Sequence, residues 1–279
     1  MPERKKQHYI SVFYLHRFTI EREGRKKGSN SSKEKRDTDI FFYDKKNKKI
    51  KKKAIKNLCF ASYLFSYKDD NNKYVHDLDD SLQKVEEDTK NCLCKLDVIA
   101  GSFKQNKSES VEVDDVILEK IIEFMIWQLR RNPELVETVL KKTKEIFKGV
   151  EGVIADKEAL SVIGRLGSNQ ECDVAPILAA KNQVIYFTKS TKFITTDTPL
   201  VRFNPSALED IREEATEIYF PLASNMLLVL YGKGNKKNFH LLNDRKRIKE
   251  INIYMAKKAR NHVFGSTKEH LESIVGCIL

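Results

Sequence analysis

Apolar residues recur at helical spacing in the middle of the chain and again near its end. The first stripe starts at Leu78 and returns every three or four residues, and the carboxylates of Asp79 and Asp80 suit the beginning of a helix. A second stripe starts at Ile117, and Pro133 disfavours helical angles at the residue before it, so this helix should end or kink there. The helices predicted in this way cover Leu78–Leu96, Ile117–Asn132, Glu134–Phe147 and Ile248–Phe264.

Residues that favour strands lie on both sides of this helical block. Residues 8–20 are rich in β-branched and aromatic types, which favours a buried strand or a short strand that leads into a helix. Residues 40–55 predict a hairpin with a turn at Asp44–Asn47, and the charged residues 21–39 predict a loop or disordered insert. The other segments of strand character are Leu58–Tyr67, Val184–Thr188, Phe193–Thr196, Glu217–Phe220 and Met226–Tyr231.

The order of these elements is a hairpin, helices, mixed strands and a closing helix. Because strands and helices fall into separate blocks, the order favours an α+β fold over a series of βαβ units. We predict one compact α+β domain over residues 1–279, with an N-terminal β-hairpin region, a helical block at 78–148 and a β-rich block at 183–264 that contains a mixed sheet and the closing helix. A chain of this length can bury a real core.

Composition places the chain among globular proteins, with 41% hydrophobic and 33% charged residues. The longest apolar stretches, such as Met226–Tyr231, fall far short of the roughly 18–20 residues that span a bilayer, and no secretory signal follows the charged N-terminus. The five cysteines are an odd number without C-x-x-C spacing, which favours free thiols over a zinc or redox site. We therefore predict a cytoplasmic protein without a membrane partner.

The net charge of +11 is unevenly distributed, because eight lysines without an acid among them lie between Lys45 and Lys56. Such a patch can neutralise several phosphates of RNA or DNA. A solvated hairpin and a contact with an acidic protein partner are alternatives that the sequence leaves open. The candidate nucleic-acid contacts are Lys45, Lys46, Lys48, Lys49, Lys51, Lys52 and Lys53.

Complete fingerprints of known enzymes are missing from the sequence. It contains no Walker loop, no G-x-G-x-x-G, no H-E-x-x-H and no G-x-S-x-G. The Arg-x(4–6)-His spacing of one class of metal-independent RNases is also missing, as is a convincing Asp…Glu-x-Lys set of the restriction-nuclease type. The cofactor is therefore unknown, and whether a divalent metal takes part stays open.

Two polar residues on the second helix are candidates for a site. Gln128 and Arg131 extend the apolar stripe of that helix and lie three positions apart, so one helix face turns from core to polar. Buried polar and charged groups need partners. One interpretation is an interior polar network that ties the helix to the sheet, and the other is an arginine that holds a phosphate or carboxylate in its fork.

Asp197 and His8 are the other candidates that the residues themselves indicate. Asp197 follows a predicted strand and precedes Thr198 and Pro199, so it suits an Asx turn that caps nearby amides, but it could equally orient a histidine or bind a metal. His8 is the best general acid or base, since histidine exchanges a proton near neutral pH. His16 would share its strand face if the segment stayed extended.

Five segments together resemble the bacterial domain-of-unknown-function family 4238. They are Gln7-His8-Tyr9-Ile10 with the following aromatics, Phe42-Tyr43-Asp44-Lys45, Trp127–Pro133, Phe193–Leu200 and Pro221–Asn225. The chain departs from the family pattern at Ser11, where proline is usual, at Thr196, where serine is common, and at Thr198, where asparagine is common. The resemblance implies a shared fold and a list of residues to test, but no activity. Glu86 lies where the family has a glutamate, and it joins that list.

We expect from these residues a nucleic-acid-acting effector, a phosphodiesterase-type hydrolase of a toxin or phage-defence kind. In this hypothesis His8 is the acid or base, Arg131 stabilises phosphate charge, Asp197 orients a group or binds metal, and the lysine hairpin follows the backbone. Gln128 and Glu86 complete the candidate site. The alternatives are a non-catalytic binding or regulatory module with a structural polar network, and an enzyme that acts on a small molecule.

Overall fold

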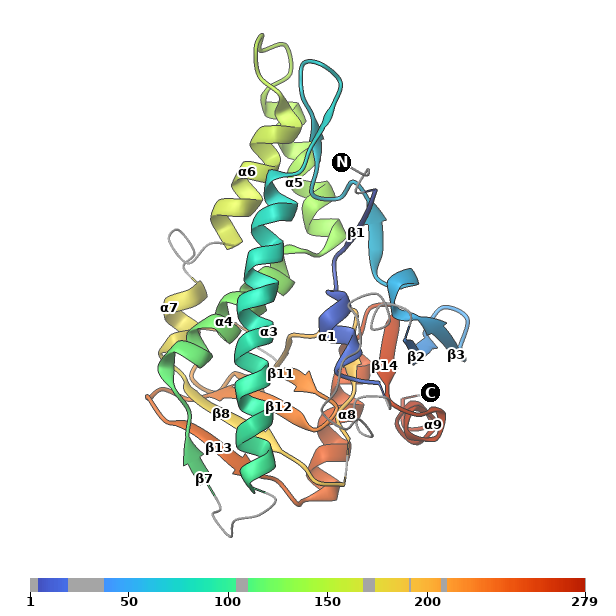
Figure 1. Cartoon of the computed structure of the whole chain (residues 1–279), viewed down its shortest axis with the longest axis vertical. Helices are drawn as coiled ribbons and strands as arrows, with labels where there is room; N and C mark the ends of the chain where they lie inside the picture. Colours follow the sequence, from blue (N-terminus) through green and yellow to red (C-terminus); the bar gives the residue numbers. More distant parts are fainter. Residues whose placement is uncertain are drawn as a thin grey trace.

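The computed structural model describes residues 5–19, 38–103, 110–167, 174–190, 192–206 and 210–278. Its largest sheet is mixed, and all neighbours in it are antiparallel except β8 and β13. Figure 1 shows this sheet below the centre of the molecule. In spatial order, its six strands are β10 (Val201–Phe203), β11 (Glu217–Ala223), β12 (Met226–Tyr231), β8 (Asn182–Phe187), β13 (Lys237–Leu241) and β7 (Ser110–Glu112).

A second sheet joins the two ends of the chain. The predicted hairpin forms its β2 (Asp39–Asp44) and β3 (Lys49–Ala54), and β2 pairs with β14 (His262–Gly265), which pairs with β9 (Thr195–Thr196). The N-terminal hairpin is therefore not a separate region. It shares one sheet with strands from the C-terminal part of the chain.

The prediction of a closing helix over Ile248–Phe264 is correct only for its first part. Helix α8 covers Arg245–Lys258, and its C-cap Ala259 has extended backbone angles. Val263 and Phe264 fit the apolar period of the helix, but their backbone pairs with β2 instead. Both side chains are fully buried there, so tertiary pairing decides the conformation.

The helices in the middle of the chain follow the predicted stripes. Asn132 has extended angles at the predicted break, and its side-chain oxygen accepts a hydrogen bond from the backbone N–H of Glu134, so one helix ends and the next begins. Two shorter helices were not predicted from the stripes, α6 (Ala155–Gly167) and α7 (Val174–Ala179), nor was α9 (Lys268–Val275). The predicted ones are α3 (Asp77–Phe103), α4 (Asp115–Arg130) and α5 (Pro133–Ile146).

The N-terminal segment follows the second of the two predicted alternatives, a strand that leads into a helix. Strand β1 (Lys6–His8) pairs with β4 (Phe60–Ser62), and α1 (Val12–His16) follows. His8 and His16 therefore do not share one strand face. Between the hairpin and α3 the chain forms a short 3₁₀ helix, η2 (Ile55–Asn57), then β4, β5 (Tyr67–Lys68) and β6 (Tyr74–Val75).

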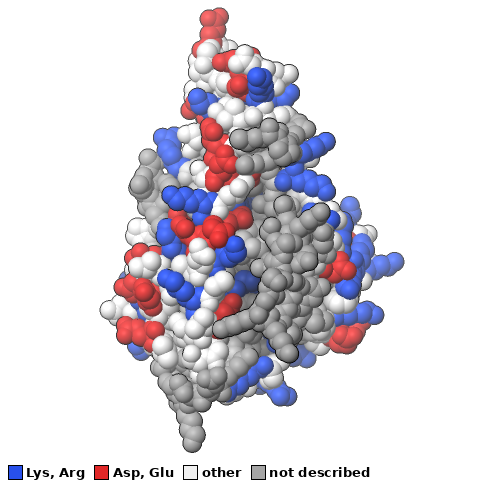
Figure 2. All heavy atoms as spheres, viewed as in Figure 1, with Lys and Arg blue, Asp and Glu red and all other residues white. Residues whose placement is uncertain are grey.

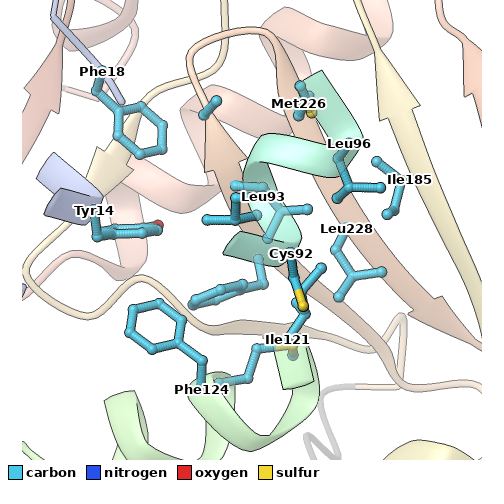
Figure 3. Close-up of a cluster of buried hydrophobic side chains, with 14 of the residues drawn as sticks. Tyr14, Phe18, Cys92, Leu93, Leu96, Ile121, Phe124, Ile185, Met226 and Leu228 are labelled. Carbon is cyan, nitrogen blue, oxygen red and sulfur yellow. The ribbon is translucent and has the colours of Figure 1, made fainter. Parts of the chain in front are cut away.

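The core lies on both faces of the six-stranded sheet. On one face, side chains of α1, α3 and α4 pack against the strands, and Figure 3 shows Tyr14, Leu93 and Phe124 in one cluster of buried side chains with Met226 and Leu228. On the other face, α8 packs against the sheet. Figure 1 shows α3 running along the long axis across the first face, with α5 and α6 at one tip. These segregated layers confirm the α+β class.

Some sequence predictions concern residues that the structure does not describe or test. Of the predicted loop at 21–39, residues 21–37 lie outside the described residues. Within the described residues, Cys59, Cys92, Cys94 and Cys277 are free thiols. No helix among the described residues has the length and apolarity needed to cross a membrane. The prediction of a single domain stays a prediction.

Candidate functional site

A large cavity is formed mainly by β1, α1 and α3, and its volume is about 1360 Å³. Six basic and four acidic side chains line it, together with two histidines, His8 and His16. His8 ends β1 and His16 ends α1, so the helical turn between them brings both onto one cavity. Small-molecule sites usually measure about 300–1000 Å³. This cavity is larger and suits a ligand of several units.

The deepest charged group of this wall is Arg131, which follows the end of α4 and is 3% exposed. Its Nη2 lies 2.6 Å from Oε1 of Glu86 on α3, and its Nη1 donates to Oγ of Ser11 at 2.6 Å. The Ser11 hydroxyl donates in turn to Oε1 of Glu86 at 2.8 Å. We call Ser11, Glu86 and Arg131 the arginine network. It joins α1, α3 and α4.

The sequence indicated two members of this network but gave no role to Ser11. Ser11 stands at the N-cap of α1 with φ −59° and makes no capping bond through its side chain. A proline would fit that φ angle, so the backbone geometry of the family pattern is retained while the hydroxyl serves the network. The sequence signal that could have identified Ser11 is that serine stands there in place of the proline usual in the family.

A second arginine pair stiffens the same wall. Arg17 donates from Nη1 and Nη2 to the two carboxylate oxygens of Asp97 on α3, both at 3.0 Å, and its Nε donates to the carbonyl of Leu222 at 2.6 Å. A two-pronged pair of this kind fixes both groups in orientation. Arg17 therefore holds α1 between α3 and the six-stranded sheet.

Gln7 fixes β1 from the other side, and sequence reasoning missed it. Its Oε1 accepts from the backbone N–H of Phe65 at 2.6 Å, and its Nε2 donates to Oγ of Ser66 at 2.6 Å. Ser66 Oγ lies 2.7 Å from Nδ1 of His76. Gln7 is 2% exposed. Its neighbour His8 can project into the cavity because Gln7 anchors the strand.

Asp197 and Gln128 line a different and much smaller cavity, of about 50 Å³, together with Tyr9. The predicted single cleft that contains His8, Arg131 and Asp197 is therefore divided. Residues 9–11 contribute to both cavities, with Tyr9 and Ile10 on the small one and Ser11 on the large one. Gln128 and Arg131 lie only three positions apart, but they line different cavities.

Asp197 caps amides, as one interpretation predicted, but those amides are remote rather than local. Its carboxylate accepts from the backbone N–H of Arg260 at 3.0 Å and of Asn261 at 2.8 Å, which fixes the entry into β14. The local turn is made by Thr196, whose Oγ1 accepts from the N–H of Thr198. Burial raises the pKa of Asp197, and the two amides act against that shift.

The histidine beside Asp197 is His262 rather than His8. Its Nδ1 lies 3.8 Å from Oδ2 of Asp197, and this nitrogen has no hydrogen-bond partner among the described residues. Gln128 is 5% exposed, and neither atom of its amide has a hydrogen-bond partner among the described residues. Both amide atoms have almost no accessible surface, so this side chain is enclosed by protein rather than presented to a ligand.

Tyr14 connects the N-terminal segment to the Thr-Thr-Asp-Thr-Pro segment. Its hydroxyl lies 2.8 Å from Oγ1 of Thr195 and donates to the carbonyl of Pro221 at 2.7 Å. Tyr14 is fully buried. Three of the five segments that resemble the family therefore meet at this ring.

The lysine hairpin differs from a uniform basic patch. Nζ of Lys45 donates to the carbonyls of Ala256, Lys257 and Ala259 at the end of α8, at 3.3, 3.1 and 2.6 Å. Lys51 pairs with Asp44 at 2.8 Å, and Lys52 pairs with Asp39 at 3.5 Å. The exposed members are Lys46, Lys48, Lys49, Lys51, Lys52 and Lys53.

Charges of both signs are interspersed on the molecular surface in Figure 2, on the face that α3 crosses and at the edge formed by β2 and β3. A structural role fits Lys45 better than a contact with nucleic acid, because carbonyls at the end of α8 hold its ammonium group.

Metal ligands are not gathered at either cavity. Within the described residues, no group of three or more His, Cys, Asp or Glu side chains is arranged to hold a metal ion.

A family model with the description "Protein of unknown function (DUF4238)" matches residues 6–269. No curated protein and no solved structure gives a significant match.

Proposed function

The chain belongs to the DUF4238 family, and we propose from its own residues that it is a phosphodiesterase-type hydrolase that acts on nucleic acid. The observation that carries this proposal is the pairing of His8 and His16 on one large cavity with an excess of basic residues. Histidine is the side chain that both takes and gives protons near neutral pH. Two of them on one cavity can serve the two proton transfers of a hydrolysis.

In the proposed reaction, water attacks the phosphorus of a phosphodiester. One histidine takes the proton of the water while the new P–O bond forms, and the other gives a proton to the leaving oxygen while the old P–O bond breaks. One water is consumed, and the two histidines exchange their protonation states until solvent restores them. Lys6 from β1 and Lys5 just before it, with Lys84 and Lys90 from α3, supply positive charge near the phosphate.

Arg131 is a positioning residue in this proposal rather than a catalytic one. Its guanidinium is engaged by Glu86 and Ser11, so a phosphate would have to displace those partners before it could bind. The arginine network instead fixes the start of α1 relative to α3, and this keeps His8 and His16 at the wall of one cavity. The effector role in toxicity or phage defence stays a prediction.

The test is a cleavage assay with purified protein on labelled RNA, single-stranded DNA and duplex DNA, with Mg²⁺, Mn²⁺, Zn²⁺ or chelator present. We expect His8→Ala and His16→Ala each to lower the rate at least about 100-fold, the lower end of what a general acid or base contributes. His240→Ala is the matched control, because His240 lies on β13 of the six-stranded sheet and does not line the cavity. Intact substrate under all conditions, or full activity of both variants, would refute the proposal.

A second candidate function is supported by the arginine network itself. Because the two terminal nitrogens of Arg131 are engaged by Ser11 and Glu86 inside the protein, the chain fits a non-catalytic binding module whose polar network is structural. In that case Arg131→Ala lowers the unfolding midpoint, and neither histidine variant changes any measured turnover. The thermal midpoint of each variant therefore has to be measured beside its rate.

A further inference from the structure

Aromatic rings and lysines alternate on the surface beside the large cavity. The register of β1 and β4 sets Lys6 opposite Ser62 and His8 opposite Phe60, and opposite residues of an antiparallel pair project to the same face. The ammonium of Lys6 lies 4.7 Å from the centre of the Phe60 ring, and the rings of His8 and Phe60 lie 5.8 Å apart. This face thus presents one ring with a cation and a histidine beside it.

The same arrangement recurs directly after β4. The rings of Tyr63 and Tyr74 stack with their centres 3.7 Å apart and their planes within 1° of parallel. The ammonium of Lys68 lies 5.3 Å from the centre of the Tyr74 ring. The backbone N–H of Tyr63 donates to the carbonyl of Lys5, so the tyrosine pair is joined to β1. We call Lys6, His8, Phe60, Tyr63, Lys68 and Tyr74 the aromatic–basic strip.

The backbone angles at both ends of β4 favour a role in binding over a role in packing alone. Cys59 and Tyr63 flank this strand, and both have positive φ, 52° and 54°. Bulky residues rarely adopt such angles, and strained positions of this kind gather at binding sites. The ring of Tyr63 stacks on Tyr74 at the surface, where both rings are only half-buried.

We propose that the aromatic–basic strip binds single-stranded nucleic acid and leads it to the large cavity. Bases stack on exposed aromatic rings whatever their sequence, and lysines neutralise the phosphates between them. A duplex fits poorly, because its bases are stacked on each other and their faces are not available. Strand β1 belongs to both surfaces, since Lys6 and His8 of the strip also line the cavity.

The charge balance of the strip also favours a polyanion. In the β5–β6 turn, Asp69 accepts from the backbone amides of Asn71 and Lys73, so its carboxylate serves the turn. Lys56 lies next to the strip, and its carbonyl is 3.3 Å from Nε2 of His8. Through this residue the strip continues to the exposed lysines of β3. Only the route into the cavity rests on the proposed hydrolase function, whereas binding to the strip does not.

The experiment is an equilibrium binding titration with a labelled thymidine 15-mer and, in parallel, the same length as a duplex, in chelator. We expect the single strand to bind tighter than the duplex. Phe60→Leu and Tyr63→Leu should each weaken binding about fivefold to a hundredfold, the range of one base–aromatic stack. Lys68→Gln should weaken it less and should reduce its dependence on salt.

Helix α8 provides a matched control, because it carries another lysine over a tyrosine, with Lys258 5.6 Å from the Tyr254 ring. Tyr254→Leu and Lys258→Gln should bind like the wild type. If an aromatic variant does not fold, the affinities of Lys68→Gln and Lys258→Gln still test the proposal, because both lysines are exposed. Equal affinity for single strand and duplex, or wild-type affinity of the strip variants, overturns the proposal.

The outcomes also separate this proposal from the hydrolase. Strip-dependent binding without cleavage under any condition supports the strip and refutes the hydrolase. Cleavage that depends on His16, together with unchanged affinity of Phe60→Leu, Tyr63→Leu and Lys68→Gln, supports the hydrolase and refutes the strip.

Discussion

Arg131 and Glu86 form an ion pair with Nη2 2.6 Å from Oε1, and 4% of the arginine side chain and 27% of the glutamate side chain are exposed. The pair joins the end of α4 to α3, and Ser11 connects both residues to α1. A buried pair gains little net stability over an apolar replacement, because both charges lose their hydration. Removing one partner is far more costly, since the other charge is then left alone.

A double-mutant cycle should reveal this asymmetry. Arg131→Met should lower the free energy of unfolding by about 3–5 kcal/mol, whereas Arg131→Met combined with Glu86→Leu should lower it by less than the sum of the single changes. Urea unfolding at neutral pH measures the three variants. Additive effects would mean that the two side chains do not interact in solution.

Ser11 should matter through its hydroxyl and not through its backbone. Ser11→Ala removes an acceptor from Arg131 and a donor from Glu86 in a site that is 1% exposed, so we expect a loss of about 1–3 kcal/mol. Ser11→Thr retains the hydroxyl and should recover part of the loss, while Ser62→Ala, on the exposed edge of β4, should change little. Unfolding curves that cannot distinguish Ser11→Ala from Ser62→Ala would contradict the network.

Local rules predicted much of the fold, because several elements are determined by residues near in sequence. The break at Asn132 and Pro133 follows from proline sterics and an asparagine cap. The β2–β3 hairpin follows from its apolar ends and polar turn. Strand β14 could not be read in this way, because Val263 and Phe264 suit a helix equally well and only pairing with β2 decides between the two.

The site was harder to predict for a geometric reason. Gln128 and Arg131 were expected to face one space, since they lie one helical turn apart, but Gln128 lines the small cavity with Tyr9 and Arg131 lines the large one with Ser11. Likewise, Asp197 was expected to act on its own turn, whereas its carboxylate caps residues that precede β14. A sequence pattern identifies the polar residues, but which of them share a cavity depends on a segment that crosses between them.

Lys45 should contribute to stability more than to binding of nucleic acid. Its ammonium donates to three carbonyls at the negative end of α8, so Lys45→Met should cost about 1–3 kcal/mol of unfolding free energy. Lys46→Met, at an exposed neighbour in the same turn, should stay within about 0.5 kcal/mol of the wild type. Thermal and urea unfolding of both variants provide the comparison, and equal midpoints would remove the structural role of Lys45.

The β2–β3 hairpin should lose part of its stability in acid through Asp44. A hydrogen bond from Lys51, and then two bonds from Asn47, hold the pKa of this carboxyl below its usual range. Because the folded-state pKa is lowered, the stabilisation is fully present above the unfolded pKa of about 3.9 and disappears as the pH falls through the folded pKa. Asp44→Asn should therefore be less stable than the wild type at pH 7, by about 0.5–1 kcal/mol for a largely exposed lysine partner, and the difference should shrink below about pH 4.

Asp39→Asn is the control, because Asp39 lies on the same hairpin, is more exposed and meets Lys52 only at 3.5 Å. Unfolding curves from pH 7 to pH 2.5 measure both variants, and a constant Asp44→Asn difference across that range would show that the Asp44 charge does not stabilise the hairpin.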